Sequence, residues 1–95
     1  MKYFDWNKEK NEILKEERDV SFEDIVDAIN EGQILDKFEH PNQKKYPNQW
    51  VYVVRIGDYA YFVPYVEDGE KEFLKTIYPS REATKKYIVK KVVLK

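Results

Sequence analysis

The stretch QWVYVVRIGDYAYFVPYVEDGEKEFLKTIY, from Gln49 to Tyr78, decides the fold. It contains three runs rich in Val, Ile, Tyr and Phe, and these runs are separated at Gly57-Asp58 and at Glu67-Asp68-Gly69, where the residue types favour tight turns. The pattern predicts three consecutive antiparallel strands, a β-meander. Pro64 lies inside the second run and cannot donate a ladder hydrogen bond, so we expect a bulge there or a nitrogen that faces away from any partner strand.

Upstream of the meander the apolar spacing is helical. A polar helix over residues 8–18 follows the N-cap Asn7, and of its side chains only Ile13 and Leu14 look buried. A second helix runs from the N-cap Ser21 to the stop at Gly32. Its apolar stripe at i, i+3, i+4 and i+7 indicates packing on a sheet and consists of Phe22, Ile25, Val26 and Ile29.

The remaining segments complete a β-α-α-β-β-β-β-α order. A short extended start precedes the helices, QILDKFEH (33–40) is a fourth strand, and the polar stretch 41–48 is a loop. Ser80 caps a last helix that begins near Arg81, and the final stretch, 87–95, is either a further strand or a tail that orders on a partner. We therefore predict one α+β domain, residues 1–95, with an antiparallel sheet and the helices packed on one of its faces.

Composition restricts the functional classes. The 95 residues suffice for a single core, and the absence of Cys removes disulfides, thiolate metal sites and a Cys nucleophile. The sequence predicts no signal peptide and no membrane span, so a cytoplasmic protein without membrane contact is expected. No zinc-ligand spacing, Gly-rich phosphate loop or Ser elbow occurs, and we expect no metal and no cofactor.

Charge is divided unevenly along the chain. Net charge is −1, yet residues 1–39 hold 6 Lys or Arg against 12 Asp or Glu, and residues 40–95 hold 11 against 6. Such asymmetry suggests an anionic partner for the basic half. The alternative is a solvated, Lys-rich surface without a partner.

Three segments together resemble a known family. The first segment, 4–25, contains Trp6, Asn7, Lys10 and Asn11, followed by the helix start VSFED. The second consists of His40, the basic residues after it and the run VVRIGDY. The third is the run IYPSREATKKY, residues 77–87. In this order they are similar to the BrnT toxins, part of the RelE/ParE-like group of bacterial toxin–antitoxin systems. Tyr87 stands where the family motif has an acidic residue.

The resemblance implies a RelE/ParE-like fold and a toxin of a type II toxin–antitoxin system. Such a toxin is a metal-independent endoribonuclease that acts on RNA, inhibits translation and is neutralised by a cognate DNA-binding antitoxin. A homodimer or a toxin–antitoxin hetero-oligomer would fit it. The alternative is a non-catalytic binding module, or a degenerate toxin that acts through its antitoxin in transcriptional autoregulation.

Metal-free RNA cleavage needs a base, an acid and positive charge on the phosphorane, roles that His, Lys, Arg and Tyr can divide. Arg81 is the strongest candidate because its planar fork suits a phosphate, although a surface ion pair would also explain it. The other candidate catalytic residues are His40, Lys75 and Tyr78; in a regular strand Lys75 and Tyr78 would point to opposite faces. Candidate RNA contacts are Arg55, Lys44, Lys45, Lys85 and Lys86.

Overall fold

The computed structural model describes residues 3–89, and within them the elements follow the predicted order with one addition, a two-residue strand before the last helix. No helix in this part of the chain is long and apolar enough to cross a membrane. The strands are β1 (Tyr3–Trp6), β2 (Ile34–Glu39), β3 (Gln49–Ile56), β4 (Tyr59–Asp68), β5 (Lys71–Leu74) and β6 (Tyr78–Pro79). The helices are α1 (Lys8–Arg18), α2 (Phe22–Asn30) and α3 (Arg81–Thr84), which continues into the π-helical turn η1 (Lys85–Val89). Residues 90–95, most of the stretch predicted to be a strand or a tail, lie outside the described part.

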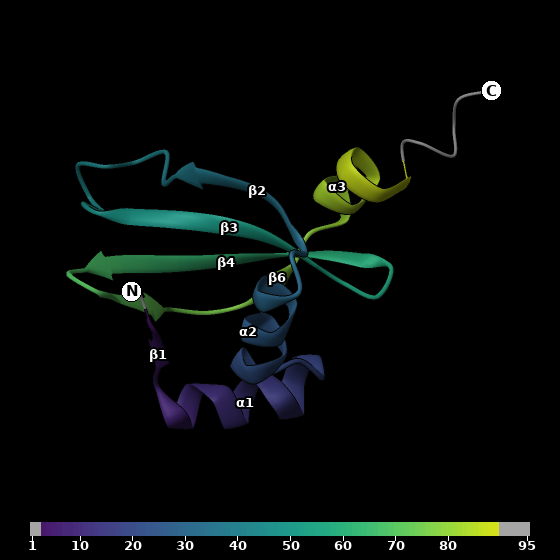
Figure 1. Cartoon of the computed structure of the whole chain (residues 1–95), viewed down its shortest axis with the longest axis horizontal. Coiled ribbons are helices and arrows are strands. Elements are labelled where there is room, and N and C mark those ends of the chain that lie inside the picture. The colour runs from purple at the N-terminus through teal and green to yellow at the C-terminus, as the bar shows by residue number, and fades with distance from the viewer. Residues whose placement is uncertain (1–2, 90–95) are drawn as a thin grey trace.

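One sheet joins the strands in the order β1-β5-β4-β3-β2 (Figure 1). The meander prediction is confirmed, because β3, β4 and β5 pair antiparallel in succession and β2 adds antiparallel to β3. The expectation of a wholly antiparallel sheet is wrong at one edge, where β1 pairs parallel to β5. The segment from α1 to α2 connects β1, at that edge of the sheet, to β2 at the opposite edge. A crossover connection of this kind permits β1 to lie parallel to its neighbour β5.

The main core lies between the sheet and the pair α1 and α2. Phe22 and Ile25 of α2 are fully buried, and they pack in one cluster with Tyr52, Val54 and other residues of the sheet. The predicted apolar stripe of α2 is therefore confirmed. In α1, Leu14 is buried as expected, but Ile13 is 46% exposed because it lies one residue further round the helix.

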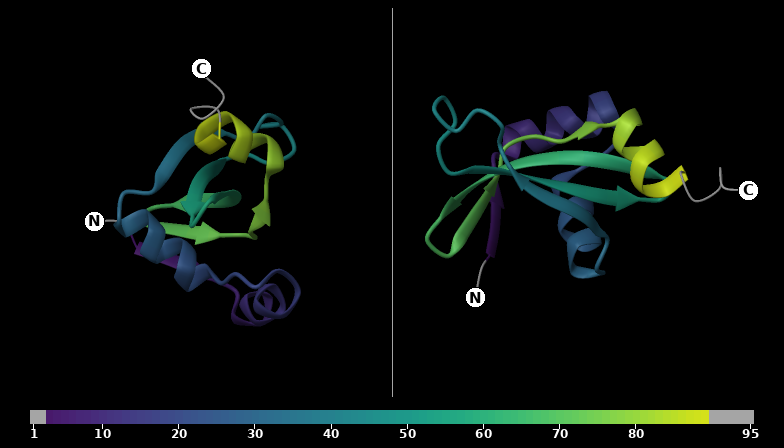
Figure 2. Two further views of the ribbon diagram at one scale, coloured as in Figure 1. Left: turned by 90° about the vertical axis from the view of Figure 1, so that its right-hand side faces the viewer. Right: turned by 90° about the horizontal axis from the view of Figure 1, so that it is seen from above.

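The last helix packs on the other face of the sheet, so the prediction that all helices share one face is wrong. Figure 2 shows α3 on the side of the sheet opposite α1 and α2. Ala83 of α3 forms a second cluster with Val53 and Ala60, whereas Tyr52, the neighbour of Val53, belongs to the main core. Successive strand residues face opposite sides, so burial of both Tyr52 and Val53 requires a cover on each face.

Pro64 interrupts the pairing along one side of β4. Its carbonyl accepts the N–H of Lys75 (2.8 Å), so its nitrogen faces the same edge, where it can donate nothing. Tyr65 pairs with Leu74 and Phe62 with Tyr78, which leaves two residues of β4 opposite three of the neighbouring segment. The strand that carries Pro64 is continuous, so the expected bulge lies instead in the neighbouring segment, where one extra residue separates β5 from β6. The alternative expectation, a nitrogen that faces away from any partner strand, is wrong.

A buried polar pair joins β3 to β5. The hydroxyl of Tyr52 donates a hydrogen bond to a carboxylate oxygen of Glu72 (2.6 Å), and the rings of Tyr52 and Tyr65 stack with centroids 4.3 Å apart. Burial, followed by the contact with Glu72, raises the pKa of the Tyr52 hydroxyl, and burial also raises that of Tyr65. Both tyrosines therefore stay protonated at neutral pH, and the pair stabilises the sheet.

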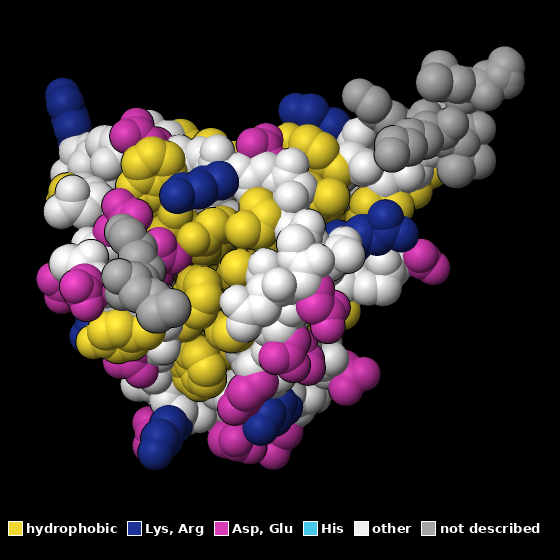
Figure 3. Space-filling view, viewed as in Figure 1, with side chains coloured by type: hydrophobic (Ala, Val, Ile, Leu, Met, Phe, Trp, Pro, Cys, Tyr) yellow, Lys and Arg dark blue, Asp and Glu magenta, His cyan; other side chains and the backbone are white. Residues whose placement is uncertain are grey.

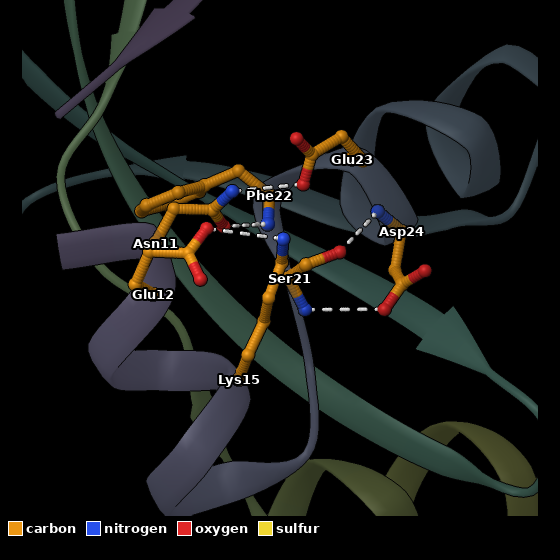
Figure 4. A network of polar contacts seen from close by, with 7 residues as sticks. All are labelled: Asn11, Glu12, Lys15, Ser21, Phe22, Glu23 and Asp24. Atoms are coloured by element: carbon orange, nitrogen blue, oxygen red, sulfur yellow. Dashed lines mark hydrogen bonds and ion pairs between the residues drawn. The ribbon is translucent and has the colours of Figure 1, made fainter. Parts of the chain in front are cut away.

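Asn11 fastens α1 to the start of α2 (Figure 4). The side chain, in a residue only 4% exposed, accepts the Phe22 N–H (2.7 Å) and donates to the Glu23 carboxylate (2.8 Å). Next to it, Ser21 and Asp24 form a reciprocal capping box, which confirms the predicted N-cap. A single amide thus satisfies a helix-terminal N–H that would otherwise be buried without a partner.

We expect Asn11→Ala to lower the free energy of unfolding by about 1–3 kcal/mol, because the buried N–H of Phe22 loses its acceptor. Urea denaturation measures the change. The matched control is Asn30→Ala, at an exposed position at the end of α2, where the same chemical change should cost less than about 0.5 kcal/mol. Equal losses in the two variants would contradict the role of Asn11.

The same contact predicts a pH dependence. The hydrogen bond from Asn11 lowers the pKa of Glu23 from its ordinary 4.5, so the stabilisation is complete above that pH and declines as the pH falls through the lowered value. Wild-type stability between pH 5 and 3 should therefore fall more steeply than that of Glu23→Gln, which cannot ionise. Parallel curves from thermal unfolding at several pH values would exclude this contribution.

Candidate nucleic-acid interface

The junction between β6 and α3 is fixed to the start of β4. The N–H of Ser80 donates to the carbonyl of Ala60 (3.0 Å), and the Ser80 hydroxyl caps α3 by accepting the N–H of Ala83 (3.1 Å), as predicted. The Thr84 hydroxyl accepts the N–H of Ala60 (2.9 Å) and donates to the Ser80 carbonyl (2.8 Å). These bonds hold the first turn of α3 against the sheet, so a side chain at position 81 starts from a well-defined backbone.

Arg81 is the first residue of α3 and is exposed. Within residues 3–89 its guanidinium makes no hydrogen bond or ion pair, so the surface ion pair that would explain it structurally is not found there. Lys85 follows one turn later and is also exposed, whereas Ala83, between them, faces the sheet. Arg81 and Lys85 therefore present two positive charges on the outward side of this helical segment.

The bulge at Pro64 brings Lys75 and Tyr78 to one face. Leu74 and Ile77 both pack in the main core, although in a regular strand residues three apart would face opposite sides. Lys75 and Tyr78 each directly follow one of these inward-facing residues, so both face the other side of the sheet. The Tyr78 ring meets Phe62 edge-on, with centroids 6.1 Å apart. The opposite orientation expected of a regular strand does not apply, and Lys75, Tyr78 and Arg81 follow one another along the β4 edge.

His40 lies at the opposite end of the sheet. The backbone N–H of His40 donates to the carbonyl of Gln49, and Gln49 pairs with Val66 near the end of β4. Ser80, which precedes Arg81, instead contacts Ala60 near the start of β4. The imidazole Nδ1 accepts the N–H of Asn42 (3.0 Å), and the ring packs on Tyr46. His40 is therefore separated from Arg81, and its side-chain contacts order the loop 41–48. The exposed Lys44 and Lys45 belong to the same loop.

Arg55 is engaged at the β3–β4 hairpin. Its Nε donates to the carbonyl of Gly57 (2.8 Å), and a terminal nitrogen lies 3.7 Å from the carboxylate of Asp58. Three acidic residues of α2 and its end, Asp24, Asp27 and Glu31, are among the residues that line the hollow beside it. The charge of Arg55 is thus partly neutralised by Asp58.

A small hollow between β2 and α3 was not foreseen from the sequence. Its volume is about 260 Å³, and Asp36, Phe38, Val53, Phe62, Glu82, Ala83, Lys86 and Tyr87 line it. The hydroxyl of Tyr87 donates to the carboxylate of Asp36, which lowers the pKa of Asp36 and raises that of Tyr87. The contact links η1 to β2 across 51 positions of sequence, which is why the pattern of one segment could not reveal it.

Charge is segregated between the two layers of the molecule. From Asp19 to Glu31, across α2, there are five acidic and no basic residues, and Figure 3 shows acidic side chains gathered over the helical layer below the sheet. From Arg81 to Val89 there are three basic residues and one acid. Within residues 3–89 no group of three or more His, Asp or Glu is placed to hold a metal ion. The candidate residues near Arg81 therefore offer cationic and phenolic groups.

Scans against protein-family models and searches among curated proteins and solved structures found no significant match. The likeness to BrnT toxins thus rests on the sequence motifs alone. Several residues of the first motif stabilise the fold. Asn7 caps α1 by accepting the Lys10 N–H, and Asn11 and Ser21 hold α1 and α2 together. In this chain these residues hold the helices in place, so the first motif by itself points to no reaction.

We expect Thr84→Val, a nearly isosteric change, to cost about 1–3 kcal/mol, because it leaves the buried N–H of Ala60 without its acceptor. The loss should appear in urea unfolding and as faster hydrogen exchange at the Ala60 amide. Thr76→Val is the matched control, since within the described chain the Thr76 hydroxyl makes no hydrogen bond. Unchanged exchange at Ala60 would show that α3 is held by other contacts.

Proposed function

We propose that this protein is the RNA-cleaving toxin of a type II toxin–antitoxin system and that it binds RNA at the β6–α3 junction. One observation carries the proposal. In the motif Ser80-Arg81-Glu82-Ala83-Thr84, the Ser caps the helix, the Ala packs in the second core and the Thr bonds β4, whereas the guanidinium of Arg81 meets no partner within residues 3–89. An exposed cation without a partner in the described residues, inside a motif whose other side chains hold the fold, is a candidate for ligand binding.

The chemistry proposed is a transesterification within RNA. The ribose 2′-hydroxyl attacks the phosphorus, the bond to the 5′-oxygen breaks, and the products carry a 2′,3′-cyclic phosphate and a 5′-hydroxyl. Arg81 would stabilise the charge that develops on the phosphorane oxygens. Lys75 and Tyr78 lie next along the same edge and would accept the proton of the 2′-hydroxyl and donate one to the 5′-oxygen.

The second candidate function is a binding module without catalysis, such as a degenerate toxin that acts through its antitoxin. The placement of His40 favours it, because the one histidine of the chain lies at the far end of the sheet from Arg81. Proton transfer at neutral pH would then depend on Lys and Tyr, whose ordinary pKa values lie near 10. RNA is the ligand of Arg81 in the first function, whereas the second requires only the antitoxin; both leave room for an antitoxin that covers this surface in the cytoplasm.

Arg81→Ala should relieve growth inhibition when the chain is expressed in bacteria, and the purified variant should bind single-stranded RNA more weakly. Because one phosphate contact is lost, the slope of log K against log salt should become shallower by about 0.7. Fluorescence anisotropy with a labelled oligonucleotide measures both quantities. Arg55→Ala is the contrast, since Asp58 already pairs with that guanidinium and the effect should be small. A folded Arg81→Ala protein with wild-type affinity and toxicity would exclude this site.

Cleavage distinguishes the toxin from the binding module. Because residues 3–89 bring together no three metal-ligating carboxylates or imidazoles, RNA cleavage should persist in EDTA and leave a 2′,3′-cyclic phosphate end. Denaturing gels and mass spectrometry of the fragments detect it. RNA that is bound but stays intact would favour the binding module, and activity lost in EDTA and restored by a divalent cation would require another mechanism.

A further inference from the structure

The hollow between β2 and α3 has the size and lining of a site for one flat ring system. Val53 and Ala83 form a buried floor, and Phe38, Phe62 and Tyr87 contribute half-buried aromatic rings. Its volume of about 260 Å³ is below the roughly 300–1,000 Å³ of sites that enclose a drug-sized ligand. It therefore suits part of a larger ligand, such as a single base, rather than a whole small molecule.

Among the described residues, Glu82 is the carboxylate of the polar rim that has no partner. Both carboxylate oxygens of Asp36 are used, one by the N–H of Lys37 (2.7 Å) and the other by the hydroxyl of Tyr87. Glu82, in contrast, is exposed and makes no hydrogen bond or ion pair within the described residues. Lys86 lies with its ammonium 5.2 Å from the centre of the Tyr87 ring. A ligand in the hollow thus meets a carboxylate that can accept two hydrogen bonds and a cation beside an aromatic ring.

We propose that this hollow binds an unstacked guanine base of single-stranded RNA, an inference that rests on the proposed function and names its substrate preference. The base would lie against the aromatic side chains, and the two oxygens of Glu82 would accept the adjacent N1–H and N2–H of its Watson–Crick edge. Adenine and cytosine place a donor beside an acceptor there, and uracil places its one N–H between two carbonyls. Only guanine matches a carboxylate with two parallel hydrogen bonds.

The position of Glu82 on the helix connects this site to the phosphate contacts. Glu82 and Lys86 lie one turn apart and line the hollow, whereas Arg81 and Lys85 occupy the outward side of the same segment. Arg81 directly precedes Glu82, so the proposed phosphate and base contacts come from adjacent residues of one helical segment. One helical segment would then read the base with one side and hold the backbone with the other.

The test uses NMR titration of the ¹⁵N-labelled full chain with guanosine 5′-monophosphate and, separately, with uridine 5′-monophosphate. We expect the guanine nucleotide to shift amide resonances of residues 36–38, 53, 62 and 82–87 and to bind about tenfold more tightly than the uracil nucleotide. Glu82→Gln, which removes one acceptor oxygen, should reduce that preference to about twofold or less. Glu17→Gln makes the same charge change on α1, away from the hollow, and should keep the tenfold preference.

The outcomes separate this inference from the proposed function. Equal affinity for the two nucleotides, no shift at the hollow, or an undiminished guanine preference in Glu82→Gln each overturns the guanine site, even if RNA is bound and cleaved. A guanine preference that disappears in Glu82→Gln and persists in Glu17→Gln supports the site. If the protein then fails to bind RNA, the hollow is a guanine site and the toxin assignment is wrong.

Discussion

The missing N–H of Pro64 is the constraint on which the arrangement of this site depends. Because the edge of β4 cannot be paired continuously there, the neighbouring segment forms β5, gains one residue, and pairs again as β6. The extra residue turns Lys75 and Tyr78 to the same face, and β6 delivers the chain to Ser80, where α3 begins. A regular strand would have sent these two side chains to opposite sides of the sheet.

Residues 3–89 cover the second face of the sheet only in part, and the hollow lies beside this partial cover. α3 and η1 together are nine residues long and cover Val53 and Ala60, while Phe38 and Phe62 remain half-exposed beside them. The main core does not depend on this helix, because α1 and α2 cover the other face with their own cluster. The α3 face can therefore hold exposed aromatic and charged groups at little cost to the stability of the whole.

Local signals predicted most of the fold, and contacts distant in sequence account for what was missed. The caps at Asn7, Ser21 and Ser80 and the irregularity at Pro64 follow from the chemistry of single residues, so the sequence was enough to place them. The parallel pairing of β1, the face on which α3 packs and the Tyr87–Asp36 contact depend on where the chain returns in space. For the same reason the candidate site was predicted only in part. The residues next to Arg81 in sequence indicate its place at the start of a helix, but nothing in the sequence around His40 indicates that His40 lies far from Arg81.

Segregation of charge makes the proposed RNA surface compatible with a net charge of −1. The acidic run from Asp19 to Glu31 belongs to the layer below the sheet, and Arg81 and Lys85 belong to the segment above it (Figure 2). Packed layers lie about 10 Å apart, and physiological salt screens exposed charges beyond about 8 Å, so each face acts largely through its own charges. An approaching polyanion is then attracted to the α3 face and repelled by the α2 face. In the proposed complex the acidic half of the sequence would orient the RNA rather than exclude it.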